Sequence, residues 1–256
     1  MGKNSPPARP GEPLRKRASD PKKKRFPENE PTMHTIYLFP GIGCTAAVFE
    51  KMRFPSSYAV RVVDWIEPRP GEDLAQYCLR LTAGIDFQAG DILAGVSLGG
   101  IAVQQIARQN PQIERVFVLS SAIHPREYAR PIRLFRALGL YRLTPGWIFR
   151  LSSLRTYLLT GHTDARRAKA AERFFAPLSG RYFRFALRVC MDFPPADKEL
   201  IRRIRRIHGH RDALFPVRRL ISPLEDIESA THLMVYSHAH AVSAVFARLI
   251  RAPWYR

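Results

Sequence analysis

The motif Gly-Val-Ser-Leu-Gly-Gly at residues 95–100 constrains the fold more than any other part of the sequence. The short run 91–94 before it predicts a buried strand, and the residues after it predict a helix. A serine at the apex of such a turn needs glycine neighbours, because side chains would collide across the strained backbone. The alternative is an ordinary turn that matches the motif by chance. We expect a nucleophile elbow built from Gly95, Ser97, Gly99 and Gly100.

Two residues further along the chain complete a candidate catalytic triad with Ser97. Asp212 follows residues 201–207, whose alternating apolar and basic side chains predict a strand. His232 follows a short strand expected near residues 226–229. A serine needs a base to accept its proton and an acid to orient that base. The order serine, aspartate, histidine is the one that a strand–turn–helix nucleophile predicts.

Each of these residues also has a simpler interpretation. Asp212 is a good capping residue and could cap a short helix over 213–220. His232 could be a structural loop histidine. His208 and His210 share the loop of Asp212 and are the rival candidates for the base, although their closeness to the acid in sequence favours His232.

The loop after the first expected strand is a candidate oxyanion site. Residues 35–39 predict a strand, and the tight loop 40–45 that follows contains two glycines. A developing alkoxide needs backbone donors that already point at it. We expect the N–H of Leu98 to act together with that of Ile42, with Gly43 as the near alternative.

Taken together, these segments resemble the α/β-hydrolase family, from His34 to the C-terminus. The resemblance rests on residues 39–43, 95–100, 208–212 and 231–232. Residues 63–68 are similar to those of compact bacterial members. Pro40 departs from the histidine that many members carry before the glycine, although it leaves the donor at Ile42 in place. Membership implies the fold and the triad, and it implies much less about the substrate.

The order of predicted elements gives the fold class and the domain limits. Strands alternate with helices up to residue 120, which predicts an α/β-hydrolase fold with a mostly parallel sheet and helices on both faces. About six strands are expected, because the sequence before His34 leaves no room for the two leading strands of larger family members. Further expected elements are helices near 46–52, 73–83, 99–109 and 235–250, and strands near 58–63 and 114–120. The expected domains are a disordered basic tail over 1–30 and a hydrolase domain over 31–256, with a helical cap over 123–200.

Positive charge is concentrated in two places. The formal net charge is +19. Residues 123–206 carry nineteen Lys/Arg and six Asp/Glu, and residues 1–30 carry nine and four. The cap charge suggests an anionic substrate, such as a coenzyme A thioester, or peripheral contact with an anionic membrane. The basic run 22–25 resembles a nucleic-acid patch, but nothing downstream resembles a nucleic-acid-binding fold, so we do not expect that partner.

Composition bears on the cellular compartment and on whether a metal or cofactor is needed. The three cysteines lack metal-ligand spacing and are odd in number, which favours a reducing compartment. The basic N-terminal residues are not followed by an apolar segment, unlike a secretory signal, so a cytoplasmic location is expected. No metal and no organic cofactor are implied.

These observations predict a serine hydrolase that cleaves a carboxylic ester, or alternatively a thioester, through an acyl-enzyme. The second hypothesis is a non-catalytic protein of the same fold that docks on an anionic membrane or an acidic partner through its cap. Nine cap aromatics are candidates for an acyl pocket, two or three of them facing the serine and the rest forming the core of the cap. They are Phe135, Trp147, Phe149, Tyr157, Phe174, Phe175, Tyr182, Phe183 and Phe185.

Overall fold

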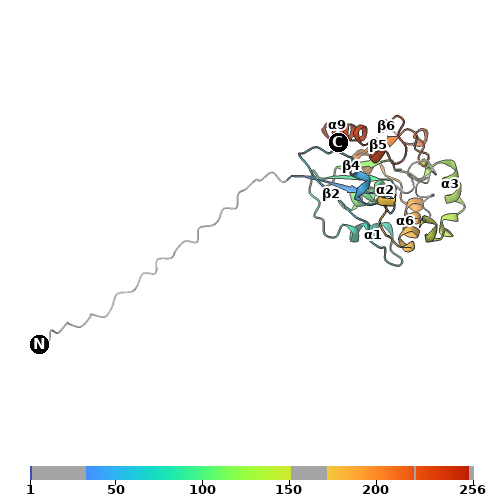
Figure 1. Cartoon of the computed structure of the whole chain (residues 1–256), viewed down its shortest axis with the longest axis horizontal. Coiled ribbons are helices and arrows are strands. Elements are labelled where there is room, and N and C mark those ends of the chain that lie inside the picture. The colour runs from blue at the N-terminus through green and yellow to red at the C-terminus, as the bar shows by residue number, and fades with distance from the viewer. Residues whose placement is uncertain (2–32, 151–171, 222, 254–256) are drawn as a thin grey trace. The chain divides into compact units, whose positions relative to one another are not determined.

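Six parallel strands form the central sheet of the computed structural model (Figure 1). Within the described residues their order across the sheet is β2-β1-β3-β4-β5-β6. They are β1 (Thr35–Phe39), β2 (Ala59–Val62), β3 (Ile92–Val96), β4 (Arg115–Leu119), β5 (Ile204–Gly209) and β6 (Glu225–Ile227). Every pairing between neighbours is parallel, so the expected sheet is confirmed.

The chain divides into two units, Met1–Thr32 and Met33–Arg256, and the sheet lies in the second. The structure describes Met1 and residues 33–150, 172–221 and 223–253. Apart from Met1, the tail expected over residues 1–30 lies outside this description, and so does its basic run. No helix in the described part is long and apolar enough to cross a membrane.

Helices cover both faces of the sheet, as expected for a parallel sheet. They are α1 (Leu74–Leu81), α2 (Leu98–Gln109), α8 (Met234–Ser237) and α9 (Ala239–Arg251). Successive strand residues point to opposite faces. Leu93 therefore joins the apolar cluster of α1 and α2, whereas its neighbours Ile92 and Ala94 join the cluster that contains Phe246 of α9. Figure 1 shows α1 and α9 on opposite sides of the sheet.

The sheet order brings together two loops that follow the carboxyl ends of neighbouring strands. β1 lies between β2 and β3, so the chain changes direction across the sheet at this point. Phe39 at the end of β1 is in register with Gly95 near the end of β3. The loop after β1 and the turn after β3 therefore begin side by side. Ligands of open parallel sheets bind at such switch points.

The described elements between β4 and β5 are helices and 3₁₀ turns, apart from an isolated β-bridge between Phe175 and Cys44. The helices and turns are η2 (Pro125–Glu127), α3 (Arg130–Ala137), η3 (Leu140–Arg142), η4 (Gly146–Arg150), η5 (Glu172–Phe174), α6 (Gly180–Asp192) and α7 (Lys198–Arg203). Helix α6 packs on α2 and on the η3 and η4 turns. We refer to residues 123–200 as the cap.

Three expected elements differ from the structure. The single helix expected near residues 235–250 is divided at His238 into α8 and α9. The strand expected over 201–207 is wrong in its first half, because α7 continues to Arg203 and β5 begins at Ile204. The side chain of Asp197 accepts a hydrogen bond from the N–H of Leu200, which starts this helix and overrides the apolar–basic alternation. The helix expected near residues 46–52 is a short 3₁₀ turn, η1 (Ala46–Phe49).

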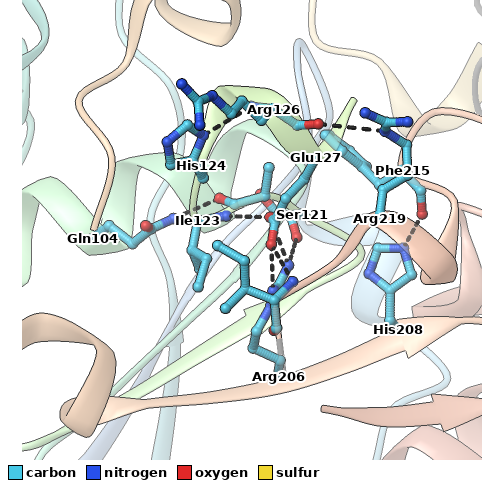
Figure 2. A network of polar contacts seen from close by, with 12 residues as sticks. Gln104, Ser121, Ile123, His124, Arg126, Glu127, Arg206, His208, Phe215 and Arg219 are labelled. Atoms are coloured by element: carbon cyan, nitrogen blue, oxygen red, sulfur yellow. Dashed lines mark hydrogen bonds and ion pairs between the residues drawn. The ribbon is translucent and has the colours of Figure 1, made fainter. Parts of the chain in front are cut away.

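A buried ion pair joins the start of the cap to the sheet (Figure 2). Arg206 on β5 binds Glu127 through two contacts of 2.7 and 2.9 Å, and both side chains are almost fully buried. Glu127 also accepts hydrogen bonds from the N–H groups of Ile123 and Ile221, at 2.8 and 2.7 Å. Arg206 donates to the carbonyl of Ser121 at 3.0 Å. The network ties two segments, residues 121–127 and the loop at Ile221, to one strand.

We expect Glu127→Ala to lower the free energy of unfolding by about 3–5 kcal/mol, because it leaves the charge of Arg206 buried and unpaired. The matched control is Glu225→Ala, which removes the exposed ion pair with Arg248 and should cost less than about 1 kcal/mol. Urea unfolding of both variants measures the difference. Equal losses in the two variants would contradict this role for the network.

Candidate active site

Ser97 lies in the sharp turn between β3 and α2, and its backbone is strained. Its φ of 54° and ψ of −116° belong to a region that residues other than glycine rarely adopt. A Cβ on Gly95 would lie 2.1 Å from the carbonyl oxygen of Gly99. A Cβ on Gly99 would lie 2.1 Å from the carbonyl oxygen of Phe39, the last residue of β1. A Cβ on Gly100 would lie 2.4 Å from the side chain of Ser121. The turn therefore requires glycine at all three positions.

The carboxylate of Asp212 contacts both the backbone that follows it and the side chain of His232. It is 3% exposed and follows β5 in a short loop. Its Oδ1 accepts hydrogen bonds from the N–H groups of Leu214 and Phe215, at 2.8 and 3.1 Å, which fixes the loop. Its Oδ2 lies 2.7 Å from Nδ1 of His232. One oxygen organises the backbone and the other orients the imidazole.

The rival histidines take different places. His208 is buried, with Nε2 at 2.9 Å from the carbonyl of Phe215 and 3.3 Å from Oδ2 of Asp212. His210 points away and pairs with the exposed Asp226 at 2.6 Å. Asp212 thus lies between two buried histidines. From the sequence, His208 was a candidate only for the base. Its supporting position was missed, although His208 shares a strand face with the buried Arg206 two residues earlier.

The surroundings of Asp212 favour its ionised form. Burial by itself would raise the pKa of this carboxyl group. The charge of His232 and hydrogen bonds with His208 and His232 outweigh that effect and hold the pKa of Asp212 well below its ordinary value. A carboxylate that stays ionised can stabilise a positive charge on the imidazole of His232.

Two backbone donors beside Ser97 remain available. In the described part of the chain, neither the N–H of Ile42 nor that of Leu98 has a hydrogen-bond acceptor, and both residues line the cavity with Ser97. The N–H of Gly43 instead donates to the hydroxyl of Tyr182 in the cap, at 3.2 Å. This geometry favours Ile42 over Gly43 as the second oxyanion donor.

Gly43 has a structural role in the same loop. Its φ is +64°, and a Cβ there would lie 2.8 Å from the ring of Phe183. Both facts require glycine. The indole N–H of Trp65 donates to the carbonyl of Gly41 at 2.9 Å and holds the loop from the other side.

An apolar cavity of about 320 Å³ extends from Ser97 under the cap. The cap contributes Ile132, Phe135, Ile148 and Leu187 to its wall. Two further aromatics in the wall, Tyr128 and Phe215, were not among the residues expected there. A second space of about 50 Å³ is lined by Ser97 and His232 together.

Of the nine cap aromatics considered from sequence, only Phe135 lines the cavity within the described residues. The others that are described lie elsewhere: Tyr182, Phe183 and Phe185 pack in the α2 cluster, Phe174 and Phe175 in the α9 cluster, and Trp147 is exposed. Tyr157 and the side chain of Phe149 lie outside the described residues. The expectation that two or three of them face the serine is therefore wrong for the described set, because the cap's own packing takes most of them.

The structure brings Ser97 and His232 to one cavity without a hydrogen bond between their side chains in the described region. In enzymes without substrate, catalytic hydrogen bonds are often long and tighten on binding. Since Nδ1 of His232 is held by Asp212, Nε2 is the ring nitrogen that remains for a proton from Ser97.

Asp212→Asn should destabilise the protein at neutral pH and much less in acid. A carboxyl group whose pKa is lowered by folding stabilises the protein above its unfolded pKa of about 3.9 and loses that contribution as the pH falls. The difference in free energy of unfolding between wild type and Asp212→Asn should therefore shrink below about pH 4. The exposed Asp226→Asn variant is the control, with a small effect expected. A difference that does not change with pH would contradict this account.

No protein-family model and no curated protein matches the sequence. Several solved structures do match. A hydrolase from Oleispira antarctica has a TM-score of 0.65 and 13% identity, and the match covers 86% of this chain and 92% of that chain. A hydrolase from Pseudomonas aeruginosa has a TM-score of 0.62 and 14% identity, with 88% of this chain and 92% of that chain covered. A thermophilic esterase from Thermogutta terrifontis has a TM-score of 0.56 and 15% identity, with 85% of this chain and 89% of that chain covered. At these identities the likeness establishes the fold alone, and this chain has the α/β-hydrolase fold.

Proposed function

We propose that this protein is a serine hydrolase that cleaves carboxylic esters, with Ser97, His232 and Asp212 as its catalytic triad. The observation that carries the proposal is the strained Ser97, which opens on a space shared with a histidine held by a buried carboxylate. Strain of this kind persists where the surrounding structure enforces it and is common at active sites. The structural neighbours include an esterase, which supports an ester as the substrate.

The reaction begins when Oγ of Ser97 attacks the ester carbonyl and its proton passes to Nε2 of His232. Asp212 stabilises the imidazolium that forms, because its Oδ2 lies 2.7 Å from Nδ1. The N–H groups of Ile42 and Leu98 bind the negative oxygen of the tetrahedral intermediate. The intermediate collapses to an acyl-Ser97 ester, and His232 returns the proton to the departing alcohol.

Water completes the cycle by the same route. His232 takes a proton from a water molecule, which attacks the acyl-Ser97 carbonyl, and the same proton returns to Oγ as the acid product leaves. A thioester would follow these steps with a thiol as the leaving group. The apolar wall of the cavity beside Ser97 favours an apolar acyl group on the substrate.

Ser97→Ala and His232→Ala should each lower kcat/KM for p-nitrophenyl butyrate by at least about a thousandfold, because the triad acts as a unit. The chain offers close controls. Ser229 is another serine with positive φ, and its hydroxyl lies 3.2 Å from Nε2 of His238. His210 is another histidine that contacts an aspartate. Ser229→Ala and His210→Ala should retain wild-type turnover.

The same assay with a panel of esters and thioesters separates the two substrate classes. A folded wild-type protein that hydrolyses none of them would contradict the proposed function. Turnover that is equal in wild type and Ser97→Ala would contradict the assignment of the nucleophile.

Ile132→Trp should reduce turnover of octanoate esters relative to acetate esters, because the larger side chain fills the cavity beside Ser97. The control is Leu134→Trp on the same helix, since Leu134 is exposed on the opposite face. The ratio of kcat/KM values for the two esters is the measurement. A ratio that changes equally in both variants would exclude the cavity as the acyl site.

A further inference from the structure

Large apolar side chains gather on the outer surface of the cap. Leu134, Leu138, Leu143 and Trp147 are 60%, 63%, 80% and 59% exposed, and Leu140 is also exposed. They lie in α3, η3 and η4 or directly after α3 and η3, so five exposed apolar residues occur within fourteen positions. Single exposed apolar residues are ordinary, but a group of them marks an interaction surface. We call these five residues the cap patch.

Arginines lie beside the cap patch and have no acidic partner among the described residues. Arg130 and Arg133 are exposed on the same helix as Leu134, and Arg218 is exposed on the turn η6 (Val217–Arg219). In the part of the chain that the structure describes, none of the three has a carboxylate within ion-pair distance. The sequence from 128 to 163 contains no Asp or Glu at all.

These arginines form one cluster. The side chain of Arg219 donates a hydrogen bond to the carbonyl of Arg126 at 3.4 Å, which joins the η6 turn to the start of the cap. Desolvation and the charges of Arg133, Arg130 and Arg218 lower the pKa of Arg219, as expected where cations are close together. The cluster therefore needs an anionic partner or solvent.

Helix α3 connects this surface to the candidate active site. Ile132 and Phe135 are three positions apart and line the cavity of Ser97. Leu134 and Leu138 are four positions apart and lie on the solvent side of the same segment. One wall of the cavity therefore presents apolar and cationic side chains on its outer face.

We propose that the cap patch and its arginines dock this protein on the surface of an anionic phospholipid membrane. Leucine and tryptophan side chains enter the boundary between headgroups and acyl chains, and arginines bind the phosphates above them. A nucleic acid would leave the leucines in water, and an acidic protein surface would need a matching apolar face. The proposal does not depend on the chemistry of Ser97.

Binding is measured by co-sedimentation of the full chain with vesicles of phosphatidylcholine alone or with 30% phosphatidylglycerol. We expect tight binding only to the anionic vesicles, weakened by salt. Each arginine near such a surface contributes roughly fivefold, so Arg130→Gln/Arg133→Gln should weaken binding on the order of twentyfold. Leu138→Gln/Leu143→Gln should weaken it at least about tenfold, since each leucine loses its apolar burial.

The matched control is Arg61→Gln/Arg251→Gln, which removes the same charge from exposed positions outside the cap. This variant and Ser97→Ala should bind like the wild type. Circular dichroism melting verifies that all variants fold. Binding that persists in both cap variants would assign it to another surface, such as the basic residues of 1–30, and would overturn the proposal. Failure of the wild type to bind anionic vesicles would also overturn it, and would favour an acidic protein partner.

Discussion

Backbone contact between the first turn of α2 and the ends of two strands is the constraint on which the rest of this structure depends. Gly95 and Gly99 leave no room for a Cβ, because carbonyl groups occupy that space. This close approach turns the chain sharply and places Ser97 in its strained conformation. It also keeps the loop of Ile42 beside the serine, since Phe39 and Gly95 are in register. The pairing of β1 with β3 therefore also places the loop of the candidate oxyanion site beside Ser97.

Buried charge appears where separate loops must be held together. Glu127 and Arg206 join the start of the cap to β5, and each of their contacts replaces hydration lost on burial. Asp212 does the same at the end of β5, where its two oxygens bind backbone and histidines. Breaking either group would leave a buried charge without its partner. The buried ionic groups therefore hold the cap and the residues of the candidate triad in place.

Local patterns in the sequence predicted the sheet, the elbow and the pairing of Asp212 with His232. Glycine spacing and strand–helix alternation depend on neighbours in the chain, so they can be recognised without a structure. The boundary between α7 and β5 was misjudged because the cap of Asp197 outweighs the alternation that follows. The supporting place of His208, the contact of Tyr182 with Gly43, and the wall formed by Tyr128 and Phe215 depend on distant segments, and no short pattern reveals them.

The most direct test of this account is the reaction of the folded protein with a fluorophosphonate, followed by intact mass and peptide mapping. Activated serines react with such compounds because a neighbouring base takes the proton. The account predicts one adduct per chain, located on Ser97, with labelling slowed strongly in His232→Ala and unchanged in His210→Ala. A folded wild-type chain that stays unlabelled, or carries its adduct on another residue, would contradict the assignment of Ser97 as an activated nucleophile.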